Sequence, residues 1–419
     1  MYLLAIHIPV YRDGNRYFTD ISWQRDLVLA RDWLAPAFGG LKLLAPTLPI
    51  DVVDGQSLQL ASIGNGDGIM VRPSFDLRCR ARDFWRRQRL EWIADVRRAL
   101  AGASVLHTSA SDIYRPLAFL AHAEGVRAGL PTVFVGPDMD PHVTMGGGVK
   151  SRAYRMVFDW FMRRALASAG LALLKEGLVH ARYSRYGKNS RAFCHSMHTS
   201  RDVIDQGRLE KRLATRSTGR PLRAVYAGRF VSRKGLRDAI GAVAAAARLG
   251  VAIEYHLFGA GPEETALRLR AAELGVTDLI RFRGVAEYGP AFLAEMATFD
   301  LLLFMPTEED TPRMLFDAMA AGLPLVGSNI PFLEHRAMHD SMGTVVGIGD
   351  VSAAAECLNR LQRQPGLLES LSRAARAAGE RHACEHWYRR RAEWTQEMVE
   401  NARITADAGK ERARGSAWT

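Results

Sequence analysis

Residues 305–328 read Met-Pro-Thr-Glu-Glu-Asp-Thr-Pro-Arg-Met-Leu-Phe-Asp-Ala-Met-Ala-Ala-Gly-Leu-Pro-Leu-Val-Gly-Ser, and this stretch places the carboxylates of Glu309 and Asp317 eight positions apart. The apolar run at 300–306 predicts a buried parallel strand. Thr311-Pro312 then predicts a helix N-cap with proline at the first helical position. We therefore expect Glu309 on the loop and Asp317 about two turns into the helix. A helix N-terminus favours an anionic diphosphate, while a loop carboxylate can accept hydrogen bonds from sugar hydroxyls.

Two further motifs lie upstream of this junction. Residues 222–240 predict a strand, a loop flanked by Arg229 and Lys234, and an Ala-rich helix. Two fixed cations beside the start of a helix suit a diphosphate. Residues 253–262 predict a strand that ends in a Gly-x-Gly-Pro turn, and residues 279–285 predict the next strand. Glycine in such turns permits a ligand to approach the backbone closely.

The order of these motifs resembles the retaining glycosyltransferases of family 4, whose GT-B fold consists of two Rossmann-like domains facing a central cleft, with C-terminal helices crossing back to the first domain. In that family two acids separated by seven residues precede an Ala-Met-Ala-x-Gly-x-Pro segment, and a Gly-Arg-x4-Lys-Gly motif lies upstream. Residues 228–235 match the upstream motif completely. Asp317 stands where the family usually has Glu, and residues 310–312 replace the usual Gly-aromatic-Gly.

The resemblance implies a nucleotide-sugar donor site in the C-terminal half, with a UDP- or GDP-hexose as substrate and no cofactor. Arg229 and Lys234 would stabilise the departing diphosphate, Glu309 would hold sugar hydroxyls, and Asp317 would reach the ribose. The implied donor-binding residues are Gly228, Arg229, Lys234, Gly259, Gly261, Pro262, Arg283, Gly284, Glu309, Asp310, Thr311, Pro312, Arg313 and Asp317. Arg313 either meets a carboxylated sugar or pairs with Glu309 or Asp310.

The alternation of strands and helices predicts an α/β protein with parallel sheets, and 419 residues suit two such domains. We expect an acceptor-binding domain over 1–216, a donor-binding domain over 217–390, and a helix end with a flexible tail over 391–419. Candidate strands of the first domain are 2–9, 103–107, 132–135 and 171–174. Those of the second are 222–228, 252–258, 279–283, 300–305, 324–327 and 343–347.

The first domain offers fewer motifs. In the family that this sequence resembles, a histidine at the end of a strand faces the donor sugar, and His107 stands at that point. The resemblance therefore makes His107 a catalytic candidate beside Glu309, Arg229 and Lys234. A histidine with a purely structural role is the alternative. The family's Gly-Gly loop after the first strand is missing here. The acceptor-binding candidates at that point are Arg12, Gly14, Asn15, Arg16 and Trp23.

Positive charge is concentrated in the first half, where residues 1–215 contain 30 Lys+Arg against 20 Asp+Glu, whereas residues 216–419 contain 26 against 25. Much of the excess lies in the amphipathic segment 78–100. Its basic and aromatic residues predict docking on an anionic membrane surface, and a core-packed helix with a solvated arginine face is the open alternative. The membrane candidates are Trp85, Arg86, Arg87, Arg89 and Trp92. Residues 154–164 are similar in character but more apolar, which favours core packing.

Several other classes of protein are not supported. Asp138-Met139-Asp140 has the spacing of a divalent-metal site, but Arg229 and Lys234 already supply the charge that such a metal would neutralise, so we expect no metal. Four scattered cysteines fit free thiols in a reducing cytoplasm. No apolar run is long enough to span a bilayer, and the N-terminus lacks a signal-peptide pattern.

The sequence thus predicts a retaining, metal-independent hexosyltransferase. The acceptor is expected to be a lipid-linked sugar or oligosaccharide in exopolysaccharide, capsule or lipopolysaccharide assembly, in the cytoplasm or on the inner face of the membrane. A nucleotide-sugar 2-epimerase of the same fold is one alternative. A basic protein that binds nucleic acid or membrane without catalysis is the other, although no nucleic-acid motif accompanies the charge.

Overall fold

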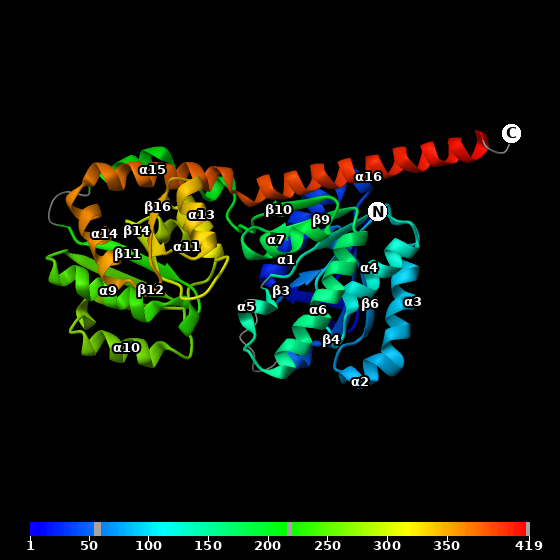
Figure 1. The fold of residues 1–419 in the computed structure, drawn as a ribbon, viewed down its shortest axis with the longest axis horizontal. Coiled ribbons are helices and arrows are strands. Elements are labelled where there is room, and N and C mark those ends of the chain that lie inside the picture. The colour runs from blue at the N-terminus through cyan, green and yellow to red at the C-terminus, as the bar shows by residue number, and fades with distance from the viewer. Residues whose placement is uncertain (54–59, 139, 216–219, 416–419) are drawn as a thin grey trace. The chain divides into compact units, whose positions relative to one another are not determined.

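The computed structural model describes residues 1–53, 60–138, 140–215 and 220–415, and the chain forms two compact units (Figure 1). Unit 1 comprises Met1–Phe193 and Trp387–Thr419, and unit 2 comprises Cys194–His386. The first boundary therefore comes earlier than the expected residue 216. The reason is that the segment after Cys194 packs on unit 2. His198 Nε2 donates to the Gly379 carbonyl at 2.8 Å, and the partly buried Arg212 side chain donates to three carbonyls, those of Ala297, Ala321 and Gly322.

Unit 2 is built on a six-stranded parallel sheet in the order β13-β12-β11-β14-β15-β16. The six strands fall where the apolar runs predict them: β11 (Leu222–Ala227), β12 (Ile253–Phe258), β13 (Ile280–Gly284), β14 (Leu301–Phe304), β15 (Leu325–Ser328) and β16 (Gly343–Val346). β11, β12, β14 and β15 are almost wholly buried, as parallel strands covered on both faces must be. The expected parallel α/β architecture is confirmed for this half.

The helices of unit 2 alternate with its strands. They are α8 (Gln206–Ala214), α9 (Leu236–Arg248), α10 (Glu264–Glu273), α11 (Pro290–Met296), α12 (Arg313–Ala320), α13 (Pro331–His339), α14 (Val351–Arg363) and α15 (Pro365–Arg381). α9 is rich in Ala, which lets it pack closely against α14, where Gly241 meets the side chain of Val351. α15 packs on α12, and a Cβ on Gly379 would lie 2.7 Å from the Ala320 backbone.

Unit 1 holds a ten-stranded sheet in the order β10-β9-β8-β7-β1-β4-β2-β3-β5, with β6 also pairing β4. Its strands are β1 (Tyr2–Ala5), β2 (Val10–Asp13), β3 (Arg16–Asp20), β4 (Leu41–Pro49), β5 (Leu60–Ile63), β6 (Ile69–Asp76), β7 (Val105–Ser109), β8 (Thr132–Val135), β9 (Leu171–Lys175) and β10 (Ser190–Phe193). The four expected strands are present. Most pairs of this sheet are parallel, as expected, and β3 is the exception, since it runs antiparallel to both β2 and β5.

The main helices of unit 1 are α1 (Ile21–Leu29), α2 (Ala81–Asp83), α3 (Arg89–Leu100), α4 (Leu117–Arg127), α5 (Pro141–Thr144), α6 (Val149–Ser168) and α7 (Leu178–Tyr183). A single π-helical turn, Phe84–Gln88, joins α2 to α3. α16 (Cys384–Gly415) takes up most of the segment 391–419, for which we expected a helix end and a flexible tail, and it continues as helix to Gly415. Tyr388, Ala392, Met398 and Val399 of α16 belong to the buried core of unit 1.

Candidate active site

The loops after four neighbouring strands of unit 2 touch one another at the carboxyl edge of its sheet. After β11 and β12, Gly228 N–H donates to the Phe258 carbonyl at 2.9 Å, and Phe230 N–H donates to the Ala260 carbonyl at 2.9 Å. Gly259 N–H donates to the Gly284 carbonyl at 2.7 Å, which ties β12 to β13. The carboxyl edge of an open α/β sheet is where such folds bind ligands.

Glycines make these close approaches possible. Gly235, which follows Lys234, has φ +62°, and a Cβ there would lie 1.5 Å from the carbonyl oxygen of Met305 at the end of β14. Gly259 has φ +132°, and a Cβ there would lie 1.9 Å from the Gly228 carbonyl oxygen. Neither the backbone angle nor the space admits another residue without a shift. Gly261 approaches the Phe230 backbone in the same way.

Three charged side chains meet between the loops after β11 and β14. The Asp310 carboxylate forms an ion pair with the Lys234 ammonium and lies 3.2 Å from Nη1 of Arg233. Only 13% of the Lys234 side chain and 10% of the Asp310 side chain are exposed. Burial lowers the pKa of Lys234, and the Asp310 carboxylate opposes that shift. Arg229, in contrast, is exposed to solvent.

Glu309 lies in this loop as a partly buried acid. Both of its carboxylate oxygens are buried and make no full hydrogen bond within the described residues, although the backbone N–H of Phe332, in the first turn of α13, is near enough to favour the charged form. Burial raises the pKa of Glu309 to about 7, and the Asp310 charge acts in the same direction. A carboxylate in this state is suited to accept hydrogen bonds from the hydroxyls of a ligand.

Asp317 is buried in the first turns of α12, as the sequence predicts. Its Oδ1 accepts a hydrogen bond from the Tyr288 hydroxyl at 2.8 Å, from the loop after β13. Burial raises the pKa of Asp317 to about 7, while the Tyr288 hydrogen bond and the Arg313 charge oppose the shift. Tyr288 is therefore a further candidate residue of the site. Sequence reasoning missed it, because a tyrosine in a loop carries no motif.

The expected helix start needs one correction, and two of the donor candidates lie at the surface, where their role stays a prediction. Thr311 is not the helix N-cap: Pro312 takes that position, α12 begins at Arg313, and no side chain caps the helix. Arg313 is exposed at the helix start. Arg283 is exposed and forms an ion pair with Glu295 at 2.8 Å, so it is already paired on the surface of unit 2.

The comparisons with known proteins agree with this geometry. The family model described as "Glycosyl transferases group 1" matches residues 208–378, which span the whole carboxyl edge described above. The likeness to the glycosyl transferases group 1 family is thus carried by these residues, most of which lie in unit 2. The expected family resemblance is confirmed over this part of the chain.

The curated relatives that match this chain are distant. The chain is 31% identical over 145 residues to the lipopolysaccharide core biosynthesis glycosyltransferase LpsD of Rhizobium meliloti, covering 35% of this chain and 40% of that protein. It is 31% identical over 179 residues to the amylovoran biosynthesis glycosyltransferase AmsK of Erwinia amylovora, covering 41% and 44%. It is 26% identical over 227 residues to the 2-deoxystreptamine glucosyltransferase of Streptomyces kanamyceticus, covering 52% and 56%. The chain thus spans about half the length of these relatives.

Solved structures extend the likeness to both units. HepE from Anabaena in complex with UDP aligns with a TM-score of 0.66 at 14% identity, covering 95% of this chain and 100% of that one. WaaG, a glycosyltransferase involved in lipopolysaccharide biosynthesis, aligns with a TM-score of 0.60 at 15% identity, covering 94% and 99%. The two Rossmann-like units with C-terminal helices are those of GT-B glycosyltransferases, so the expected fold is confirmed.

In unit 1, His107 lies inside the sheet. β7 continues to Ser109, so His107 is not at the strand end that the sequence suggested. Its Nδ1 forms a 2.6 Å hydrogen bond with the Tyr2 hydroxyl, and burial lowers the pKa of His107 to about 3. This environment holds a neutral imidazole in the core and favours the structural alternative. A role toward the sugar stays a prediction.

His7 is a histidine that sequence reasoning passed over. It follows β1 at the carboxyl edge of the unit 1 sheet, with its Nδ1 buried and without a hydrogen bond in the described residues. Burial lowers the pKa of His7, and the charges of Asp112 and Asp138, which follow β7 and β8, oppose the shift. Its position after the first strand was the available signal.

The acceptor candidates lie on a β-hairpin and the helix after it. Gly14 and Asn15 form the turn between β2 and β3, and Gly14 has φ +57°. Arg16 forms an ion pair with Asp13 across this turn, and Arg12 Nε donates to the Gly14 carbonyl at 2.8 Å. Trp23 in α1 packs partly buried against the unit 1 core. These contacts shape the hairpin, and acceptor binding by its residues stays a prediction.

The segment 78–100 divides its candidate membrane residues between core and surface. Trp92 is fully buried, and its Nε1 donates to the Leu117 carbonyl at 2.9 Å, so its assignment to a membrane contact is wrong. The apolar face of α3 covers the sheet, as in the alternative interpretation. Trp85 remains 42% exposed, and Arg86 and Arg87 are exposed beside it.

The two acids of the possible metal motif are engaged by cations. Asp138 pairs with Lys175 at 2.7 Å, and Asp140 caps α5 and pairs with Arg182 at 2.6 Å. Within residues 1–53, 60–138, 140–215 and 220–415, no group of three or more His, Cys, Asp or Glu side chains could hold a metal ion. All four cysteines are free, as expected. Among the described helices, none is both long and apolar enough to cross a membrane.

Proposed function

We propose that this glycosyltransferase moves a hexose, with retention of anomeric configuration, from a nucleotide sugar to a hydroxyl of a lipid-linked or polysaccharide acceptor. One observation carries the proposal. Within the family-matched residues, the carboxyl edge of the unit 2 sheet brings basic side chains that suit a diphosphate close to two acids, the partly buried Glu309 and the buried Asp317. Their carboxylates can accept hydrogen bonds from hydroxyls.

Each group has a chemical task in this proposal. As the bond between sugar and diphosphate breaks, negative charge grows on the diphosphate, and Arg229 and Lys234 stabilise it. Glu309 holds hydroxyls of the sugar, and Asp317 holds the ribose together with Tyr288. The leaving phosphate assists removal of the proton from the acceptor hydroxyl, so a strong protein base is not required.

The acceptor class is supported by the relatives. LpsD is named for lipopolysaccharide core biosynthesis and AmsK for amylovoran biosynthesis. We propose an acceptor of this general kind, used in assembly of exopolysaccharide, capsule or lipopolysaccharide. HepE was solved with UDP and with UDP-glucose, which makes uridine nucleotides the first donors to try.

The donor test is a thermal-shift screen with UDP, GDP, ADP and their common sugar conjugates on wild type, Lys234→Ala and Glu309→Ala. We expect one nucleotide family to stabilise the wild type and Lys234→Ala to weaken that effect. The additional effect of the sugar should disappear in Glu309→Ala. If no nucleotide shifts the wild type, the proposal fails. Turnover of the sugar without any acceptor would instead identify a 2-epimerase.

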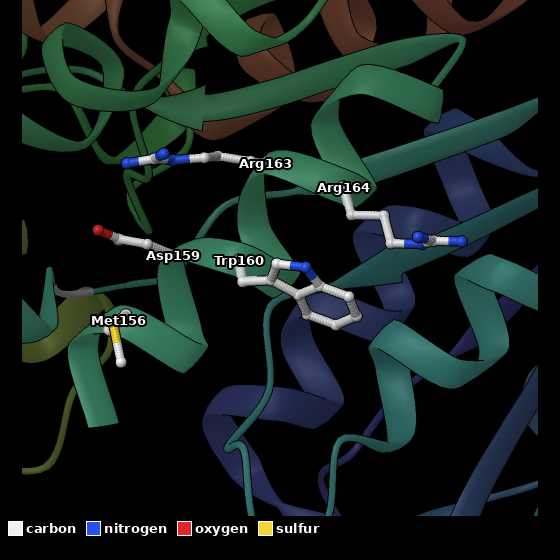
Figure 2. A pocket seen from close by; sticks show the side chains of 5 residues that line it. All are labelled: Met156, Asp159, Trp160, Arg163 and Arg164. Atoms are coloured by element: carbon white, nitrogen blue, oxygen red, sulfur yellow. The ribbon is translucent and has the colours of Figure 1, made fainter. Parts of the chain in front are cut away.

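We further propose that unit 1 docks on an anionic membrane that carries the acceptor, at its cytoplasmic face. The outer side of α6 presents Met156 (70% exposed) and Trp160 (56% exposed) beside Arg163 and Arg164 (Figure 2). The Arg164 guanidinium lies 5.7 Å from the Trp160 ring. Exposed aromatic and basic side chains together suit the interface of an anionic bilayer.

This α6 surface continues toward the segment that the sequence pointed to. Trp85 Nε1 donates to the Tyr114 carbonyl at 2.9 Å, and the Tyr114 ring lies 5.8 Å from the ring of Tyr154 on α6. Arg89 lies 5.6 Å from the Trp85 ring. Trp85, Arg86, Arg87 and Arg89 therefore remain candidates for membrane contact.

Vesicle flotation tests the docking. The wild type should float with vesicles that contain anionic lipid and not with neutral ones, and Trp160→Ser with Arg164→Gln should reduce flotation. Met338→Ser, which removes an equally exposed apolar side chain from unit 2, is the matched control and should leave flotation unchanged. Flotation that is independent of lipid charge would count against docking.

A further inference from the structure

Asp310 occupies the cations that the donor site offers to a diphosphate. Its carboxylate pairs with Lys234 and lies 3.2 Å from Arg233, and both partners belong to the loop after β11. Arg233 lies inside the Gly-Arg-x4-Lys-Gly motif, so this chain places a third basic residue beside Arg229 and Lys234 and sets an acid against it. At the position of Asp310 the glycosyltransferases of family 4 usually have glycine.

The two loops do not need this ion pair to stay together. Thr307 N–H donates to the Arg233 carbonyl at 3.1 Å, and Gly235 lies directly against the Met305 carbonyl. These backbone contacts fix the loop geometry, so the Asp310 side chain can leave Lys234 without opening the loops. The ion pair is therefore free to act on ligand binding.

We propose that Asp310 is an internal competitor of the donor diphosphate and sets how tightly the site holds nucleotides. Because Asp310 acts on the donor site, its role rests on the proposed function. A diphosphate that reaches Lys234 must displace the carboxylate, and it exchanges one ion pair for another. Nucleotide binding is weakened by the strength of the pair that is broken.

The same exchange favours release of the product. After transfer, the nucleoside diphosphate would otherwise leave the side chains of Arg233 and Lys234 without a counter-charge in a partly buried site. Asp310 restores the counter-charge as the nucleotide departs. Such a site binds the nucleotide less tightly and releases the product faster. Product release is the step that limits turnover in many enzymes.

The test measures the affinity of UDP, GDP and ADP by titration calorimetry on wild type, Asp310→Asn, Asp310→Gly and Glu308→Gln. Glu308→Gln is the matched control, since it removes one negative charge from an exposed neighbour in the same loop. We expect Asp310→Asn and Asp310→Gly to bind the preferred nucleotide at least about tenfold more tightly than wild type, in line with couplings of close charge pairs. Glu308→Gln should change affinity by less than about threefold.

The outcomes separate this role from the donor site itself. If Lys234→Ala weakens nucleotide binding while Asp310→Asn binds no more tightly than wild type, Asp310 is not a competitor and the donor site stands. Weaker binding by Asp310→Asn would show that Asp310 orients Lys234 instead. If no nucleotide binds to wild type or to either Asp310 variant at millimolar concentration, the proposed function falls and this role falls with it.

Discussion

Replacing Gly235 by alanine should damage unit 2 far more than the same change at Gly250. Both glycines have positive φ, +62° and +82°, so both alanines carry the strain of the left-handed region, about 1 kcal/mol. A Cβ at Gly250 meets nothing within 4 Å, whereas a Cβ at Gly235 would lie 1.5 Å from the Met305 carbonyl oxygen. Displacing that backbone adds about 1–3 kcal/mol. We expect losses of about 2–4 kcal/mol for Gly235→Ala and about 1 kcal/mol for Gly250→Ala.

The positions of the tryptophans allow the unfolding of the two units to be followed separately. All eight tryptophans lie in unit 1, so tryptophan fluorescence follows that unit, whereas far-ultraviolet circular dichroism follows both. In urea, Gly235→Ala should shift the unfolding transition of unit 2, which circular dichroism detects and tryptophan fluorescence does not. It should also weaken nucleotide binding, because Lys234 is its neighbour, and Gly250→Ala should not. Equal destabilisation by the two substitutions would refute the close approach of the two loops.

Three further predictions concern buried groups. Asp317→Asn should stabilise the ligand-free protein by on the order of 2 kcal/mol at pH 8 and not at pH 4. The pKa of Asp317 is about 7 in the folded protein and about 4 in the unfolded chain, so the unfolded chain ionises first and the folded state loses stability as pH rises from about 4 to about 7. Urea titrations at pH 4 and pH 8 check this. Trp92→Ala should lower the free energy of unfolding by about 3–5 kcal/mol and Trp85→Ala by less than about 1 kcal/mol, both measured by the fluorescence transition. Equal losses would contradict the burial of Trp92 and the exposure of Trp85. Arg212→Met should cost about 2–4 kcal/mol by the dichroism transition because three carbonyls lose their donor, and a neutral effect would mean that water replaces it.

The donor half of the molecule follows closely from its sequence, because its strands are continuous apolar runs and its loops carry motifs. Glu309 and Asp317 lie where their spacing places them, and so does the loop of Lys234. The pairing of Lys234 with Asp310 is less accessible to sequence reasoning. The two residues are 76 positions apart, and their contact depends on β14 lying next to β11 in the sheet.

Unit 1 shows where pattern reasoning reaches its limit. The amphipathic segment 78–100 has one periodicity whether its apolar face meets lipid or a sheet, and only the neighbouring strands reveal that Trp92 is covered. The β2–β3 hairpin had a local signal, since Gly14-Asn15 between two short aromatic-containing runs is typical of a tight turn. The boundary at Phe193 had none, because Arg212 is bound by carbonyls that lie far along the chain.

The division of the chain into units also dictates an order of folding. Unit 2 is one continuous segment, so every contact in its core is available as soon as His386 has been synthesised. Unit 1 begins first but lacks Tyr388, Met398 and Val399 until α16 follows. During translation the N-terminal segment must therefore wait with part of its apolar core uncovered while the segment inserted within it folds. Shortening α16 before Val399 should for the same reason produce a protein that binds nucleotide yet aggregates.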